Sequence, residues 1–132
     1  MAMLISELVT WVTVTPNLSI LSVIEGAYVQ FTCKTSPGVP ATTVRWFKAE
    51  HKSGIPHMEF TDSSQFSIHT NISGTISSLQ ILPRRNDSGI AIYCKAMNNF
   101  TEVESQRRVG LNVLRTCKIV ITNNTRKKCP SF

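Results

Sequence analysis

Four cysteines are the residues of this 132-residue chain with the most distinctive chemistry. Thiolates can hold a metal ion, or pairs of thiols can be oxidised to disulfides. Cys33, Cys94, Cys117 and Cys129 are even in number and are spaced too widely for the C-x-x-C pairs typical of zinc sites. The spacing therefore favours disulfides and an oxidising compartment, and we expect an extracellular protein.

Asparagine side chains offer a second kind of chemistry, attachment of N-linked sugars in Asn-x-Ser/Thr sequons. The five sequons, none with Pro in the middle, begin at Asn17, Asn71, Asn86, Asn99 and Asn123. One or two sequons can arise by chance in a chain rich in Asn, Ser and Thr. Five in so short a chain indicate a glycoprotein of the cell surface or a secreted one.

Residues arranged for catalysis or metal binding are not found. His51 and His57 lie near Glu50 and Glu59, but no third ligand follows at a fixed spacing, and His69 is isolated. The chain also offers no nucleophile with a base, no paired carboxylates and no glycine-rich phosphate loop. We expect a protein that is not an enzyme and that needs neither metal nor cofactor.

The net charge of +6 is concentrated at one end of the chain. Residues 1–106 hold seven basic and eight acidic side chains, whereas residues 107–132 hold seven basic and none acidic. The seven are Arg107, Arg108, Arg115, Lys118, Arg126, Lys127 and Lys128. Such a cluster can bind a polyanion. Outside the cell, we expect that polyanion to be heparan sulfate rather than nucleic acid. The alternative is a solvated basic stretch that leads to a following domain.

The elements that position these residues are predicted to be strands, because apolar residues recur with a period of two. The alternation is clear in 29–34, 44–46, 79–81, 90–96 and 109–113. Pro and Gly residues separate these stretches, and at most one helical turn is expected, around 83–88. Several short strands of this kind predict an all-β sandwich or barrel.

The arrangement of Cys33, Trp46 and Cys94 resembles that of the immunoglobulin superfamily. Both cysteines lie on inward faces by parity, and the pieces Leu79-x-Ile81, Asp87-Ser88-Gly89 and Tyr93-Cys94 strengthen the resemblance. The resemblance implies a Greek-key β-sandwich of two antiparallel sheets over residues 1–115. It also implies a Cys33–Cys94 disulfide between the sheets and a core that contains Trp46, Leu79, Ile81 and Ile92.

Two details bear on the subtype and on local geometry. Residues 96–100 look like the A-x-N-x-x-G stretch of I-set domains. The segment between Trp46 and Cys94 leaves room for one extra strand near 58–60, so we expect the I-set, with a short V-set as the alternative. The family usually places a tyrosine two residues before the second cysteine, where its hydroxyl forms the tyrosine corner. Ile92 occupies that position here and Tyr93 is displaced by one. Either the chain bulges before this strand or the corner is absent.

Cys117 and Cys129 bracket a segment with Asn123-Asn124 at its centre. We expect residues 116–132 to form a hairpin extension closed by a Cys117–Cys129 disulfide. The alternative is that residues 116–132 begin a following domain and that Cys117 and Cys129 each pair with a cysteine further downstream. The chain has no apolar run of the ~18 residues needed to cross a bilayer, and we expect it to be part of a longer secreted or membrane-anchored protein.

These inferences predict an extracellular recognition or adhesion domain that binds a protein or its own copy. Parity places Arg45, Phe47, Tyr93 and Lys95 on the outward face of one sheet, where aromatic side chains suggest a contact surface. The alternative is that the aromatic side chains are ordinary cross-strand neighbours, half covered by others. Some I-set domains of growth-factor receptors bind heparan sulfate, so the resemblance leaves that function open, together with a purely structural spacer.

Overall fold

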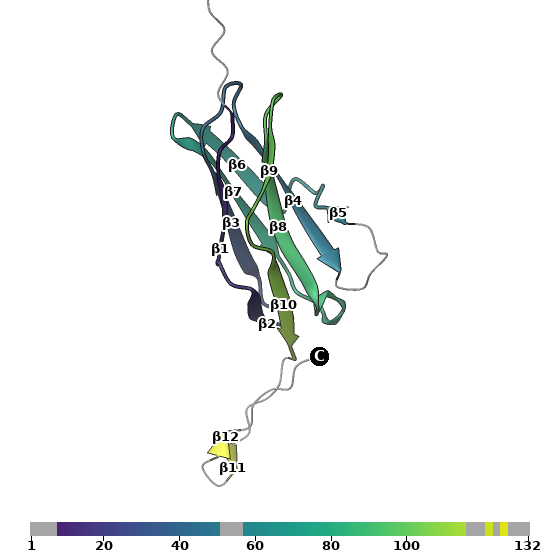
Figure 1. Cartoon of the computed structure of the whole chain (residues 1–132). Coiled ribbons are helices and arrows are strands. Elements are labelled where there is room, and N and C mark those ends of the chain that lie inside the picture. The colour runs from purple at the N-terminus through teal and green to yellow at the C-terminus, as the bar shows by residue number, and fades with distance from the viewer. Residues whose placement is uncertain (1–7, 51–56, 116–120, 123–124, 127–132) are drawn as a thin grey trace, which may run out of the picture.

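The computed structural model describes residues 8–50, 57–115, 121–122 and 125–126, and nearly all of its regular structure is strand (Figure 1). The strands are β1 (Val12–Thr15), β2 (Ile20–Ile24), β3 (Val29–Thr35), β4 (Thr43–Glu50), β5 (Met58–Glu59), β6 (Phe66–Asn71), β7 (Gly74–Ile81), β8 (Ile90–Met97), β9 (Glu102–Glu104), β10 (Val109–Leu114), β11 (Ile121–Thr122) and β12 (Thr125–Arg126). The five alternating stretches of the sequence all lie within strands, as predicted.

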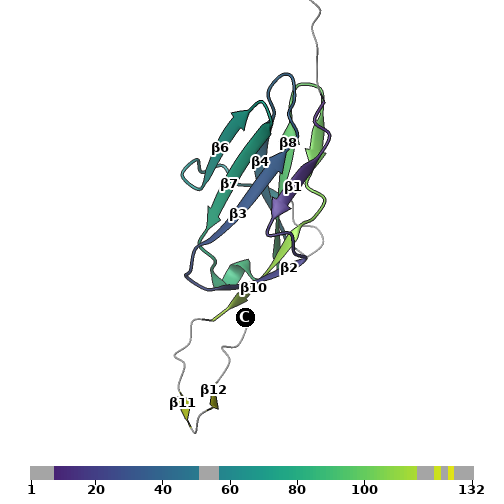
Figure 2. The ribbon, with the colours of Figure 1, turned by 90° about the vertical axis from the view of Figure 1, so that its left-hand side faces the viewer.

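Two sheets pack face to face, which confirms the immunoglobulin-like sandwich (Figures 1 and 2). One sheet has the order β1-β3-β7-β6, and the other has the order β2-β10-β8-β4-β5, with β9 paired to β8. Consecutive strands β1 and β2 belong to different sheets, a division that the sequence pattern did not reveal. The pairs within both sheets are antiparallel except at one edge, where β2 runs parallel to β10.

The core is built from the inward positions of both sheets, joined by the predicted disulfide. Cys33 of β3 and Cys94 of β8 form that bond across the sandwich. Because the crosslink spans 61 positions of sequence, the chain-entropy model assigns it about 4 kcal/mol of stabilisation. The predicted core residues Trp46, Leu79 and Ile92 are buried with it, as is Ile81.

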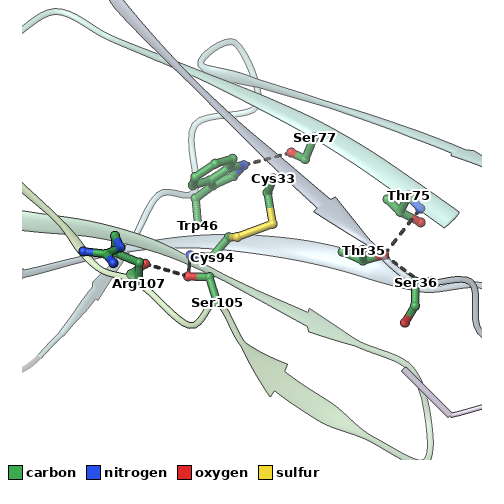
Figure 3. Close-up of a disulfide and its surroundings, with 9 residues drawn as sticks. All are labelled: Cys33, Thr35, Ser36, Trp46, Thr75, Ser77, Cys94, Ser105 and Arg107. Carbon is green, nitrogen blue, oxygen red and sulfur yellow. Dashed lines mark hydrogen bonds between the residues drawn. A yellow bond between two sulfur atoms is a disulfide. The ribbon is translucent and has the colours of Figure 1, made fainter. Parts of the chain in front are cut away.

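Hydrogen bonds satisfy the polar atoms beside the disulfide (Figure 3). Trp46 is the register partner of Cys94, and its indole Nε1 donates to Ser77 Oγ at 2.8 Å. Ser105, which is also buried, accepts from the Cys94 amide at 3.2 Å and donates to the Arg107 carbonyl at 3.2 Å. The indole is therefore fixed in position by a bond to the opposite sheet.

The tyrosine corner is replaced by apolar packing. Ile92 is fully buried at the position where the family usually has a tyrosine, and it has no hydroxyl to donate. The chain turns into β8 through Gly89, whose φ of +92° favours glycine. The Gly89 amide donates to the Leu111 carbonyl at 2.9 Å, so a backbone bond to β10 ties down this end of β8.

The predicted helical turn is present as η1 (Arg85–Asp87), a single 3₁₀ turn. The Asp87 carboxylate accepts from the Arg84 amide at 2.9 Å and closes the turn. Within the described ranges, no helix is long and apolar enough to cross a bilayer.

The extra strand expected near 58–60 is β5, which pairs antiparallel with Phe47 and Lys48 of β4. Near the C-terminus, β11 and β12 pair antiparallel, Ile121 opposite Arg126, as a hairpin requires. Cys117 and Cys129, which were expected to close this hairpin, lie outside the described residues. The predicted boundary between 1–115 and 116–132 therefore stays a prediction.

Candidate functional site

The outer face of the β2-β10-β8-β4-β5 sheet carries a stacked aromatic pair at its centre. Phe47 of β4 and Tyr93 of β8 are direct register partners. Side chains of directly opposed residues lie close enough for aromatic rings to interact. The two ring centroids are 5.4 Å apart, and the ring planes differ by 16°. The prediction from parity that both rings lie on the same face therefore agrees with the structure.

Two cations lie over these rings. The Arg108 guanidinium is 4.4 Å from the centroid of Tyr93, and the Lys95 Nζ is 5.1 Å from the centroid of Phe47. Both distances are within the ~6 Å range of cation–π attraction. The face thus presents an aromatic centre covered by positive charge.

Each cation of the face is paired with a glutamate. Lys95 Nζ lies 3.2 Å from a Glu102 carboxylate oxygen, and Arg108 Nε donates to Glu104 at 2.7 Å. The third pair joins Arg45 of β4 to Glu59 of β5 at 3.6 Å. We call these three ion pairs and the Phe47–Tyr93 stack the recognition face. Its three positive and three negative charges cancel.

Tyr93 was expected on the outward contact surface, but the residue is only 1% exposed. Phe47, Arg108 and the His57 ring cover it, and its hydroxyl is hydrogen bonded to His57 Nδ1. Burial raises the pKa of the Tyr93 phenol above its ordinary value, and Arg108 opposes that effect in part. Tyr93 thus lies beneath the other residues of the recognition face. The accessible part of the face consists of Phe47, Lys95 and the other charged residues of the ion pairs.

Arg108 was expected to belong to a basic, polyanion-binding tail. Its hydrogen bond to Glu104 raises its pKa still further, so it stays charged and paired. Arg107 and Arg108 precede β10 while Arg115 follows it, and a strand of that length separates its two ends by about 20 Å. These three arginines therefore do not form one cluster. The side chains of Lys118, Arg126, Lys127 and Lys128 lie outside the described residues.

Sequence reasoning did not identify the residues that surround the aromatic pair. Glu102 and Glu104 alternate along β9 and lie on the same side as Lys95 of β8. The alternation in β9 is too short to be recognised as a strand without its partner strand β8. His57 and Glu59 were considered only as weak metal ligands. The described residues contain no group of three His, Cys, Asp or Glu that could hold a metal ion.

The outer face of the other sheet is different in chemistry. Its strands present mainly hydroxyl and amide side chains, among them Thr32, Ser78 and Gln80. A shallow polar groove of about 370 Å³ runs along this side, lined by Gln30, Ser64, Gln65, Phe66, Ser67, Ser78, Leu79 and Gln80. It has neither an aromatic stack nor opposed ion pairs, so the recognition face is the more distinctive surface.

Comparison with known proteins agrees with the fold. Residues 12–105 match the family of CD80-like C2-set immunoglobulin domains. Cell adhesion molecule 2 of Homo sapiens is 31% identical over 93 residues, which cover 70% of this chain and 20% of that protein. The Mus musculus and Rattus norvegicus proteins match to the same extent, so the chain spans about a fifth of these relatives.

A solved structure shares the architecture at low sequence identity. The crystal structure of Rst D1-D2 superposes with a TM-score of 0.62 at 16% identity, over 82% of this chain and 50% of that one. The matching family is the C2-set, whereas the sequence had favoured the I-set. The subtype thus differs from our expectation, but the superfamily does not: this chain belongs to the immunoglobulin superfamily, as a C2-set-like domain related to cell adhesion molecules.

Proposed function

We propose that this chain is an extracellular adhesion domain, and that it binds a second copy of itself through the recognition face. The observation that carries the proposal is the stacked aromatic pair together with the three ion pairs over and beside it. A protein interface typically has an aromatic centre and a polar rim, and this face has both. The relationship to proteins named Cell adhesion molecule 2 supports the same function.

Charge favours a second copy over an unrelated partner. A two-fold interface brings the same surface of both copies together, so each charge must meet an opposite charge or be neutralised. A face with three cations and three anions can satisfy this condition. Exposed ion pairs stabilise a fold by only ~0–1 kcal/mol each, and their arrangement is better explained by specificity and orientation in binding.

Sedimentation velocity at increasing concentration of the secreted, oxidised chain tests this function. Phe47→Ala removes the accessible ring, and we expect it to weaken self-association by about tenfold or more, as for a residue at an interface centre. Ile76→Ala is the matched control, because Ile76 is a partly exposed apolar residue on the other sheet.

Equal loss of association in both variants would contradict the assignment to this face. A chain that stays monomeric at every concentration would leave a spacer role or a different protein partner. The predicted heparan sulfate site is a separate hypothesis, checked by retention on heparin above physiological salt and its loss in a variant with Arg126, Lys127 and Lys128 neutralised.

A further inference from the structure

Three predicted glycosylation sites lie next to large apolar side chains that are open to solvent. Leu18 is 46% exposed, Ile72 is 97% exposed and Phe100 is 59% exposed. Each is the middle residue of a sequon: Asn17-Leu18-Ser19, Asn71-Ile72-Ser73 and Asn99-Phe100-Thr101. Single exposed apolar residues are common on soluble proteins. Their recurrence at the same position of three sequons needs a separate explanation.

Local hydrogen bonds hold two of these asparagines at the tips of hairpins. In the turn between β6 and β7, the Ser73 amide donates to Asn71 Oδ1 at 2.8 Å. A sugar is attached through Nδ2, the other polar atom of that amide, so the turn and the modification are compatible. In the turn between β8 and β9, Asn98 Oδ1 accepts from the amides of Phe100 and Thr101, each at 3.0 Å. That network leaves Asn99 and Phe100 exposed at the tip.

Asn17 occupies the third position, in the connection between β1 and β2. Its side chain is exposed, and the carbonyl of Ser19 within the same sequon accepts from the Gly110 amide at 2.8 Å. The backbone of this sequon is therefore anchored to β10 while Asn17 and Leu18 face solvent. All three sites combine an anchored backbone with an exposed asparagine and an exposed apolar neighbour.

We infer that N-linked glycans on Asn17, Asn71 and Asn99 cover Leu18, Ile72 and Phe100, and that they keep these side chains from promoting non-specific association. In the attachment step, Nδ2 forms a bond to the anomeric carbon of an oligosaccharide, its proton is lost, and the polyprenyl diphosphate of the donor leaves. Neighbouring Cα atoms are about 3.8 Å apart, and in these exposed turns and connections we infer that the first sugar ring packs over the adjacent side chain. The apolar face of the ring then replaces water over that side chain.

The sequon at Asn86 provides an internal comparison. Asn86 is exposed like the others, but its middle residue is Asp87, whose carboxylate accepts from the Arg84 amide at 2.9 Å. A glycan there has no apolar side chain of its own sequon to cover. Removing it should therefore change solubility and dye binding far less. This inference concerns surface shielding, and it holds whether or not the recognition face mediates adhesion.

The test uses the folded chain secreted from eukaryotic cells, with peptide mapping to establish which asparagines carry sugar. Enzymatic deglycosylation of the folded protein should raise the fluorescence of the dye anilinonaphthalene sulfonate about twofold or more, because apolar surface is uncovered. Asn71→Gln and Asn99→Gln should each raise it in part, whereas Asn86→Gln should not.

A second variant separates shielding from loss of sugar as such. The triple change Leu18→Ser, Ile72→Thr and Phe100→Gln retains every sequon, creates no new one and removes the three apolar side chains. We expect this variant to bind the dye no more strongly after deglycosylation than before it. The inference is wrong if the three asparagines carry no sugar, if deglycosylation leaves dye binding unchanged, or if the triple variant responds like the original chain.

Discussion

The indole of Trp46 shows at the scale of one residue how the sandwich handles a polar atom in its core. Trp46 is 1% exposed and Ser77, which accepts its N–H, is 0% exposed. Ser77→Ala would leave that donor buried without a partner, which costs ~1–3 kcal/mol. We expect this loss in the free energy of unfolding, measured by urea denaturation of the oxidised chain. Ser78→Ala, one residue further and on the outer side of β7, should change it by less than about 0.5 kcal/mol.

A second prediction at this scale concerns Tyr93. Its burial determines the direction in which the stability of the fold changes with pH. Because the pKa of Tyr93 is raised in the folded chain, the folded state holds the phenol proton more tightly than the unfolded state does. Stability is therefore unaffected below the unfolded pKa of about 10 and falls as pH rises through the folded pKa. In a Tyr28→Phe variant, phenolate absorbance at 295 nm should appear above pH ~10. Ionisation of Tyr93 below the ordinary value would contradict its place beneath Phe47 and Arg108.

At the scale of the element, the hairpin between β6 and β7 depends on Gly74. Its φ is +133°, and a Cβ built there would lie 2.0 Å from the Thr35 carbonyl oxygen of the neighbouring strand. Gly74→Ala therefore combines backbone strain with a clash against backbone, and we expect it to cost about 3 kcal/mol or more. Gly26→Ala is the control, because φ there is +79° but nothing lies within 4 Å of the added Cβ, so strain alone costs about 1 kcal/mol. Equal losses on thermal unfolding would refute the contact with Thr35.

Strands that alternate strongly could be predicted from sequence, and those defined by their partners could not. Period-two stretches located β3, β4, β7, β8 and β10, and parity placed Phe47 and Tyr93 on one face. β2 escaped notice because it is an edge strand whose Ile20 and Ile24 point outward. The parity of a residue in a strand predicts which face of the sheet its side chain lies on, but not how exposed that side chain is. The burial of Tyr93 depends on Arg108 and His57, which come from elements distant in sequence.

At the scale of the whole molecule, we predict that the two outer faces have different roles. The sheet with β4 and β8 carries the aromatic stack and the opposed charges, while the sheet with β3 and β7 carries hydroxyl and amide groups. If charge contributes to self-association, Lys95→Glu should weaken it and raise the dissociation constant by about tenfold, because it places like charge beside Glu102 on both copies. Sedimentation in low salt measures this change. Lys34→Glu on the other sheet is the control and should leave association unchanged.

Mapping by nuclear magnetic resonance tests the central claim most directly. Amide resonances of the ¹⁵N-labelled, oxidised chain are compared between dilute and concentrated solutions. Self-association through the recognition face predicts shifts concentrated at Phe47, Lys95 and Glu104, with little change at Thr32 and Gln80. Shifts confined to the β3 and β7 face, or no shifts at any concentration, would contradict it.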